Sequence, residues 1–261
     1  MSAAAPSPAG QAAGQLAAMI RAAGSVVALT GAGISVPSGI PDFRSPGTGL
    51  WERVDPMKVA HIDAFQRDPA EFWRFYSERF QALSDKRPNG AHRALARLEQ
   101  AGLLDAVITQ NIDRLHRRAG SVNVIEVHGS IASSSCLSCA TRLPLEAVRD
   151  RQSGAPDGVP RCDAGHPLKP DVVLFGELLP AEAFARAERL AAQADVMLCI
   201  GSSLEVHPVA GLPEITLAAG GSVAIITQGP TALDRQAAVR LDGDVVEELE
   251  SLLDDLGLTE P

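Results

Sequence analysis

The sequence is poor in aromatic residues, in cysteines and in basic side chains. Phe, Trp and Tyr make up only 4% of the 261 residues, so the core must be aliphatic. Lys and Arg number 23 against 32 Asp and Glu, and a net charge of -9 argues against a dedicated nucleic-acid binder. No apolar run reaches the ~18 residues of a membrane-spanning helix, and the N-terminal segment lacks the pattern of a secretory signal. We therefore expect a cytoplasmic protein with no membrane partner.

What the chain does contain is typical of a globular protein. Hydrophobic residues make up 46% and charged residues 21%, which excludes a largely disordered chain, and the length suits one large domain or two. Cys136 and Cys139 form a C-x2-C pair, Cys162 follows, and Cys199 lies in an apolar run. In a reducing compartment such a pair favours metal or redox chemistry over a disulfide.

Strand-like segments alternate with stretches of helical character along most of the chain. Six short apolar runs have the composition of buried strands: 25–30, 105–109, 122–128, 171–175, 195–201 and 221–227. A helix is predicted before the first of them, with Gly24 as its stop. The alternation predicts an α/β fold with a doubly wound, mostly parallel Rossmann-type sheet, whose ligands bind at the carboxyl ends of the strands.

Two stretches interrupt the alternation. Residues 41–84 contain both Trp, the only Tyr and five of the seven Phe, and residues 131–169 contain three of the four cysteines. We expect them to form a smaller domain, with a helical module and a zinc-ribbon-like module, beside a cleft. The larger domain would comprise residues 10–40, 85–130 and 170–261, after a flexible tail at 1–9.

A glycine turn follows the first predicted strand. Gly31-Ala32-Gly33 lacks bulky side chains, so its amides could approach a pyrophosphate closely. The dehydrogenase fingerprint needs a third glycine where this chain has Val36, and no strand with an acidic end follows about 20 residues on. A P-loop is excluded because no G-K-[ST] occurs.

Several longer motifs resemble, in the family's order, the sirtuins, among them the bacterial NAD-dependent protein-lysine deacylases. The matching runs are Thr30-Gly31-Ala32-Gly33-Ile34-Ser35, Ser38-Gly39-Ile40-Pro41-Asp42-Phe43-Arg44, Thr109-Gln110-Asn111-Ile112-Asp113, His128-Gly129, Cys136-x2-Cys139, Val172-Val173-Leu174-Phe175-Gly176-Glu177 and Gly201-Ser202-Ser203-Leu204. The resemblance covers nearly the whole chain. It implies an enzyme that transfers the acyl group of acyl-lysine to ADP-ribose and releases nicotinamide and 2'-O-acyl-ADP-ribose.

The resemblance also implies roles at the NAD site. His128 is the expected general base, Asn111 orders the ribose, and Asp113 holds the nicotinamide carboxamide. The other expected NAD contacts are Gly31, Ala32, Gly33, Ser35, Asp42, Phe43, Arg44, Gln110, Ile112, Gly201, Ser202, Ser203, Thr227, Gln228 and Val245. Thr227 stands where sirtuins usually carry Asn. The plain alternatives are a structural histidine at 128 and a helix N-cap at Asn111.

The substrate is expected to be an acylated protein. An acyl-lysine peptide would add as a strand to the segment containing Val172, Val173, Phe175, Gly176 and Glu177. Tyr76-x2-Arg79 matches the spacing with which some sirtuins grip succinyl or malonyl groups, but an amphipathic helix with an exposed Arg79 is favoured. The most favoured activity is therefore deacetylation. Alternatives are desuccinylation or demalonylation, and NAD-consuming ADP-ribosyl transfer.

The metal site departs from the family pattern. Sirtuins usually bind zinc with two cysteine pairs, but Gly165 stands where the partner of Cys162 is expected. His166 is the first choice as fourth ligand after Cys136, Cys139 and Cys162, and Asp163 is the second, because zinc accepts a Cys3His set. Loss of one cysteine equally suits a degenerate site. Cys199 is expected to be a small buried hydrophobic residue.

Overall fold

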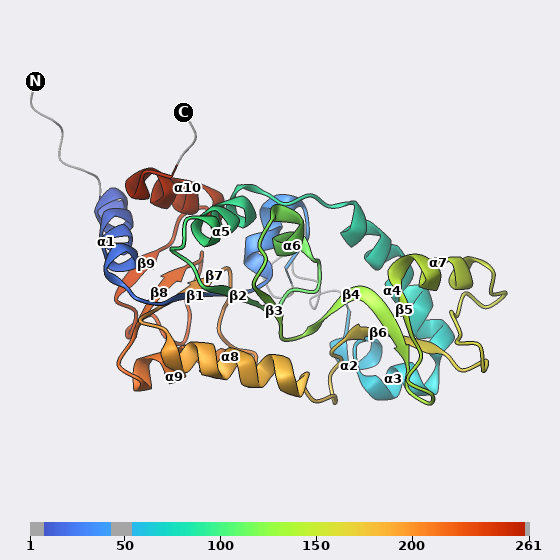
Figure 1. The fold of residues 1–261 in the computed structure, drawn as a ribbon. Helices are drawn as coiled ribbons and strands as arrows, with labels where there is room; N and C mark the ends of the chain where they lie inside the picture. The colour runs from blue at the N-terminus through green and yellow to red at the C-terminus, as the bar shows by residue number, and fades with distance from the viewer. Residues whose placement is uncertain (1–7, 43–53, 259–261) are drawn as a thin grey trace, which may run out of the picture.

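The fold centres on a parallel β-sheet of six strands in the order β3-β2-β1-β7-β8-β9. The computed structural model describes residues 8–42 and 54–258 (Figure 1). The strands are β1 (Val26–Thr30), β2 (Ala106–Thr109), β3 (Val124–Glu126), β7 (Val196–Ile200), β8 (Ser222–Ile226) and β9 (Val239–Leu241). Each neighbouring pair is parallel, so all their carboxyl ends lie at one edge of the sheet.

Helices cover both faces of this sheet, as Figure 1 shows. One face packs on α1 (Pro8–Ala22), α5 (Gly90–Gln100) and α10 (Val245–Leu256), and the other packs on α8 (Ala181–Gln193) and α9 (Leu212–Ala218). Alternate side chains of β1 supply the two cores: Val26 and Ala28 face the first group, and Val27 and Leu29 face the second. This arrangement explains why the strands are continuous apolar runs.

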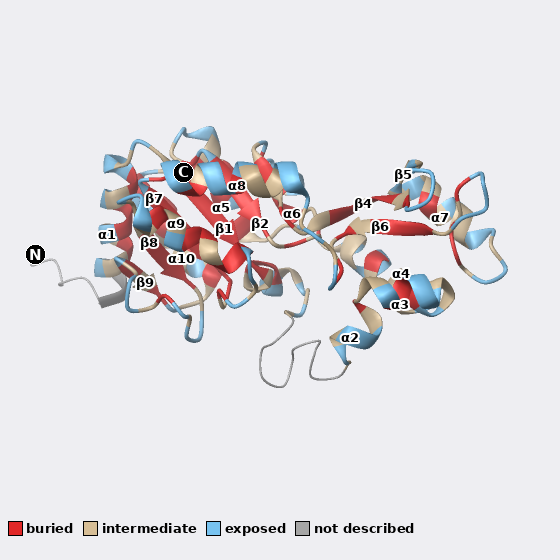
Figure 2. Ribbon diagram, turned by 90° about the horizontal axis from the view of Figure 1, so that it is seen from below, coloured by how far each residue is buried: buried red, intermediate tan, exposed pale blue. Residues whose placement is uncertain are grey.

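A smaller antiparallel sheet of three strands lies beside the parallel one. Its order is β5-β4-β6, with β4 (Gly129–Cys136), β5 (Arg142–Pro144) and β6 (Leu168–Val172). It packs with α3 (Ile62–Arg67), α4 (Pro69–Asp85) and α7 (Leu145–Ser153), and α2 (Pro56–Val59) precedes α3. The core between them is aromatic and includes Trp73, whose Nε1 donates to the Leu168 carbonyl at 2.9 Å. Figure 2 shows buried residues along β4 and β6 as well as in the parallel strands.

Short elements complete the chain. The turn after β1 continues as η1 (Ala32–Ser38), the helix α6 (Leu115–Ala119) precedes β3, and η3 (Val209–Gly211) leads into α9. Within residues 8–42 and 54–258, no helix combines the length and the hydrophobicity that a bilayer crossing requires.

All but one of the predicted strands form in the parallel sheet, and the exception is 171–175. Only its first two residues are in a strand, and that strand, β6, pairs antiparallel with β4 in the small sheet. The predicted domain boundary at residue 170 lies inside β6. The helix α1 begins at Pro8, within the predicted tail 1–9, and proline suits the first helical position.

Candidate functional site

The turns after β1 and β7 pack directly against each other at the carboxyl edge of the sheet. The Gly33 amide donates to the Gly201 carbonyl at 2.8 Å. A Cβ added at Gly31 would lie 2.7 Å from the Gly201 carbonyl oxygen, and one added at Gly33 would lie 2.7 Å from the Gly201 Cα. Gly201 itself has a φ of +60°. The contact between the two turns therefore requires glycine at positions 31, 33 and 201. The sequence alone did not show this reason.

Polar side chains from two segments, η1 and the loop after β2, meet in a buried cluster at this edge. The Ser35 hydroxyl donates to Asp113 Oδ2 at 2.7 Å. Asn111 Nδ2 donates to the Gly31 carbonyl at 3.0 Å and to Ser35 Oγ at 3.2 Å. Burial raises the pKa of Asp113, although hydrogen bonds from the Leu115 amide and from Ser35 oppose this. The structure therefore brings together three of the predicted residues and fixes the Asn111 amide.

His128 lies at the junction between β3 and β4. Its Nδ1 is 3.1 Å from the Gln110 carbonyl oxygen. A carbonyl can only accept, so Nδ1 carries the proton and the Nε2 lone pair is available. Burial lowers the pKa of His128, and the bond to Gln110 opposes this shift. A neutral imidazole with a free Nε2 is the form that a general base needs.

The ends of β2 and β7 are joined through Gln110. Its Nε2 donates to Ser202 Oγ at 3.0 Å, and the same oxygen accepts from the Leu204 amide at 3.2 Å. The Ser203 hydroxyl instead donates to the Glu205 carboxylate at 3.2 Å. Of the two predicted serines, Ser202 therefore faces the polar cluster through Gln110, while Ser203 is held by a neighbour.

The remaining predicted NAD residues lie around this edge or outside the described residues. Thr227 directly follows β8, and its Oγ1 donates to the Gln228 carbonyl at 3.4 Å. Val245 is the first residue of α10, and Ile112 packs against the aromatic core. Ala32 begins η1, and Asp42 ends a described range. Phe43 and Arg44 lie outside the described residues.

The segment after β6 is held on both sides. The Val173 amide donates to the His128 carbonyl at 2.9 Å, and the Phe175 amide donates to the Ala60 carbonyl at 2.8 Å. The Leu174 amide donates to the Glu177 carboxylate at 2.8 Å. Gly176 is exposed, with a φ of +86°, and its backbone N–H and C=O make no hydrogen bond within the described residues. The open backbone therefore begins at Gly176 and not at Val172.

Tyr76 and Arg79 share a helix face, but they have different partners. The Tyr76 ring lies 4.5 Å from the Phe72 ring and 5.1 Å from the Phe80 ring, and burial raises its pKa to about 12. The Arg79 guanidinium lies 3.6 Å from the centre of the Phe75 ring and donates to the Phe75 carbonyl at 2.6 Å. Arg79 is thus turned back along α4.

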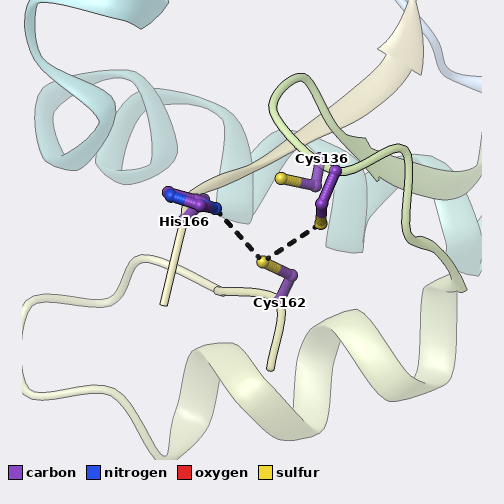
Figure 3. A group of neighbouring side chains, drawn as sticks. Cys136, Cys162 and His166 are labelled. Atoms are coloured by element: carbon purple, nitrogen blue, oxygen red, sulfur yellow. Dashed lines mark hydrogen bonds between the residues drawn. The ribbon is translucent and has the colours of Figure 1, made fainter. Parts of the chain in front are cut away.

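Three cysteines and one histidine converge at the far end of the small sheet (Figure 3). One possible ligand atom from each of Cys136, Cys139, Cys162 and His166 lies within 4.8 Å of the others. The Sγ atoms of Cys139 and Cys162 are 3.6 Å apart, close to the ~3.8 Å that tetrahedral zinc with Zn–S bonds of about 2.3 Å requires. Asp163 instead pairs with Arg151 at 2.7 Å. The donor set fits zinc.

Comparison with known proteins identifies the family. The model of the Sir2 family matches residues 31–208. The chain belongs to the Sir2 family. It is 48% identical to an NAD-dependent protein deacetylase of Caldivirga maquilingensis, covering 88% of both chains. It is 44% identical to an NAD-dependent protein deacylase of Aeropyrum pernix, over 89% of this chain and 92% of the other.

Solved Sir2 structures extend the likeness to the fold. A Sir2 variant with a deacetylated p53 peptide and 3'-O-acetyl ADP ribose superimposes with a TM-score of 0.88, at 41% identity, over 94% of this chain and 98% of the other. A complex of Sir2 with a p53 peptide and NAD+ has a TM-score of 0.86 over the same shares. The fold class and the family predicted from the sequence are confirmed.

Two buried histidines of this Sir2 chain were not singled out from the sequence. His92 Nε2 lies 3.4 Å from Ser35 Oγ, and His116 Nε2 lies 2.9 Å from Thr30 Oγ1, with 4.8 Å between the ring centres. Burial lowers the pKa of His92 to about 4 and that of His116 well below its usual value. His92 lies beside Ala91 among the buried residues of α5, so the apolar pattern of this helix was the signal that could have identified it.

Proposed function

We propose that this protein is an NAD-dependent protein-lysine deacetylase. The observation that carries the proposal is His128, a neutral imidazole whose Nε2 has no hydrogen-bond partner among the described residues. It lies at the edge of the sheet where Ser35, Asn111 and Asp113 form one hydrogen-bonded cluster. Relatives of 43–48% identity carry the names NAD-dependent protein deacetylase or deacylase. Family and site chemistry therefore point to the same reaction class.

The cluster has the chemistry to hold the nicotinamide half of NAD. Asp113 is an acceptor for a carboxamide N–H, and Asn111, fixed by the Gly31 carbonyl, presents an amide to the ribose. Gln110 and Ser202, joined at 3.0 Å, would contact the ribose further along, and the turns at Gly31 and Gly201 leave backbone near the phosphates. When bound, NAD supplies the ADP-ribose that accepts the acyl group.

His128 would act through Nε2. Because Nδ1 is held by the Gln110 carbonyl, the ring has one tautomer and one open lone pair, which can take a proton from a ribose hydroxyl. Burial keeps the imidazole neutral at pH 7, so deacylation should fall as the pH drops through the lowered pKa of His128. The proton returns to solvent when the product leaves.

The acyl-lysine peptide would join the backbone at Gly176. Its free N–H and C=O can form the hydrogen bonds of strand addition, while Val172, Val173 and Phe175 place this backbone beside His128. Backbone recognition depends little on the side chains of the substrate, which suits an enzyme acting on many acylated proteins. An acetyl group is favoured over succinyl because the Arg79 guanidinium is already engaged by Phe75.

The zinc ligands we propose are Cys136, Cys139, Cys162 and His166. Zinc would connect the turn after β4 to the loop before β6. Its role would be structural, because four protein ligands leave no coordination position open for a substrate or water. A C-x2-C pair used for metal binding is typical of a reducing compartment, and we propose the cytoplasm.

The test is mass spectrometry of a reaction with NAD and three matched peptides carrying acetyl-lysine, succinyl-lysine or unmodified lysine. Acyl-ADP-ribose and nicotinamide should appear together, and only with an acylated peptide. His128→Ala should abolish the formation of acyl-ADP-ribose and still give a cooperative thermal melt. Nicotinamide without acyl-ADP-ribose would instead favour hydrolysis or ADP-ribosyl transfer, and normal turnover by the variant would refute the role of His128.

A further inference from the structure

A lysine is buried beneath the segment that ends at Gly176. The Lys169 side chain on β6 is only 7% exposed, and Nζ lies 2.9 Å from Glu177 Oε2. Nζ also donates to the carbonyls of Pro170 at 3.0 Å and Val172 at 2.8 Å. An ammonium group has three protons, so each has an acceptor here. Because a buried charge without partners is costly, these groups must stay together.

The partner of this lysine closes the turn around Gly176. Glu177 Oε2 accepts from the Leu174 amide at 2.8 Å, and the Leu174 carbonyl accepts from the Glu177 amide at 3.1 Å. The carboxylate thus binds the inner side of the turn, while Phe175 and Gly176 are exposed on its outer side. Glu177 is already engaged by groups of its own chain, so it is not free to grip a substrate.

Other hydrogen bonds connect the same segment to the base and to the helical part. The Val173 amide is bound to the His128 carbonyl, and the Phe175 carbonyl accepts from the Ile62 amide at 2.9 Å. With Lys169 as the third attachment, the segment has a fixed position relative to His128. Loss of the lysine would remove its bonds to the Val172 carbonyl and to the Glu177 carboxylate together, and would leave the backbone hydrogen bonds of Val173 and Phe175 in place.

We propose that Lys169 and Glu177 are a positioning pair for the acyl-lysine substrate. The buried ion pair holds the turn at Gly176 in the conformation to which the substrate backbone adds. This inference rests on the proposed deacetylase function. Neither residue touches the reacting atoms, so the pair acts on substrate affinity and not on the chemical step.

The expected signature is a change in one Michaelis constant only. In Lys169→Met, which keeps the length of the side chain and removes its charge, the peptide KM should rise about tenfold, because binding must then order about one further backbone residue of the turn. The kcat should stay within about threefold, and the KM for NAD within about twofold, since the NAD cluster is untouched.

Three further variants sharpen the test. Glu177→Gln keeps an oxygen for the Leu174 amide and should raise the peptide KM by less than Lys169→Met does. The double variant should be no worse than Lys169→Met alone, because the two residues act as one unit. The matched control is Arg142→Met, which removes the ion pair between Arg142 and Asp171, whose atoms are 2.7 Å apart. Asp171 lies on the same strand as Lys169, outside the turn. Its peptide KM should not change.

Each outcome decides one question. Wild-type protein that forms no acyl-ADP-ribose would refute the proposed function and not the pair. With an active wild type, a Lys169→Met peptide KM within twofold of wild type would overturn the inference, and so would single-variant effects that multiply in the double variant. Thermal melts establish that each variant is folded at the assay temperature. If Lys169→Met does not fold, the inference is tested by comparing the peptide KM of Glu177→Gln with that of Arg142→Met.

Discussion

The buried histidine His92 should make the stability of this protein depend on pH. Burial lowers its pKa to about 4, with a smaller contribution from Arg93, whereas an unfolded chain has a histidine pKa near 6.5. A folded-state pKa below the unfolded one means that the unfolded state binds more protons between these values. His92 therefore destabilises the fold as the pH falls from about 6.5 towards about 4.

The size of the effect follows from the two pKa values. At pH 7.5 the imidazole is neutral in both states, so it contributes almost nothing to the pH dependence. At pH 5 it is about 97% protonated in the unfolded chain and about 10% protonated in the fold, which costs about 2 kcal/mol. For a typical protein, this is a large fraction of the total free energy of unfolding.

The measurement compares urea unfolding of wild type and His92→Gln at pH 7.5 and pH 5. The variant should be less stable at pH 7.5, because it alters a buried contact with Ser35, but its free energy of unfolding should fall less on acidification. The gap between the two proteins should shrink by about 2 kcal/mol. Asp113, whose raised pKa has the opposite effect, is present in both and cancels.

A matched control is His207→Gln, because the His207 side chain lies in solvent. Its stability difference from wild type should be the same at both pH values. If the gap for His92→Gln changes by less than about 0.5 kcal/mol, or if His207→Gln shows the same change, the imidazole of His92 is not held neutral by burial and the reasoning fails.

Three further predictions follow from the site. His166→Ala should lower the zinc content of the purified protein measured by atomic emission, and retention of one zinc per chain would remove His166 from the ligand set. Gly129→Ala should lower the free energy of unfolding by more than about 3 kcal/mol in urea melts. The reason is that Gly129 has a φ of +74° and that an added Cβ would lie 2.0 Å from the Asp171 carbonyl oxygen. A smaller loss would contradict this packing. Arg79→Met should leave the rate of deacetylation within about twofold of wild type and should not change the ratio of the rates on acetyl and succinyl peptides. A selective loss of desuccinylation would show instead that the guanidinium leaves Phe75 to bind an acyl carboxylate.

The position of the site was predictable because parallel strands end at one edge. Once Thr30, Thr109 and Gly201 are taken as the ends of the predicted strands, the polar residues after each of them are expected to meet there. The hydrogen bonds among Ser35, Asn111 and Asp113 agree with that expectation, although the sequence carried no information about which atoms pair.

The placement of the run 171–175 was not predictable from its composition. An apolar stretch of strand character does not say which sheet it joins, and the three-stranded sheet is defined by pairing with β4, more than thirty residues earlier. A single lysine just before such a run, here Lys169, is expected to lie on the protein surface. Its burial depends on Glu177, which was itself taken for a substrate contact.

The spacing of Tyr76 and Arg79 shows a different limit. Residues three apart on a helix share a face, and this much was correct in the sequence. A long side chain can nevertheless turn towards either neighbouring turn, and Arg79 turns to Phe75, four residues before it. Rotamer choice depends on which ring and carbonyl are nearest, and that depends on packing that the spacing of two residues does not encode.

Gly31 and Gly33 have both a role that the sequence predicts and a role that only the packing shows. They were expected to allow a phosphate to approach the backbone, yet their first role is to let the turn after β1 pack on Gly201. This contact carries Ser202 to the position where Gln110 binds it, and Gly31 also offers the carbonyl that orients Asn111. A bulkier residue at either position would therefore separate the turn after β1, with Ser35, from the turn after β7, with Ser202.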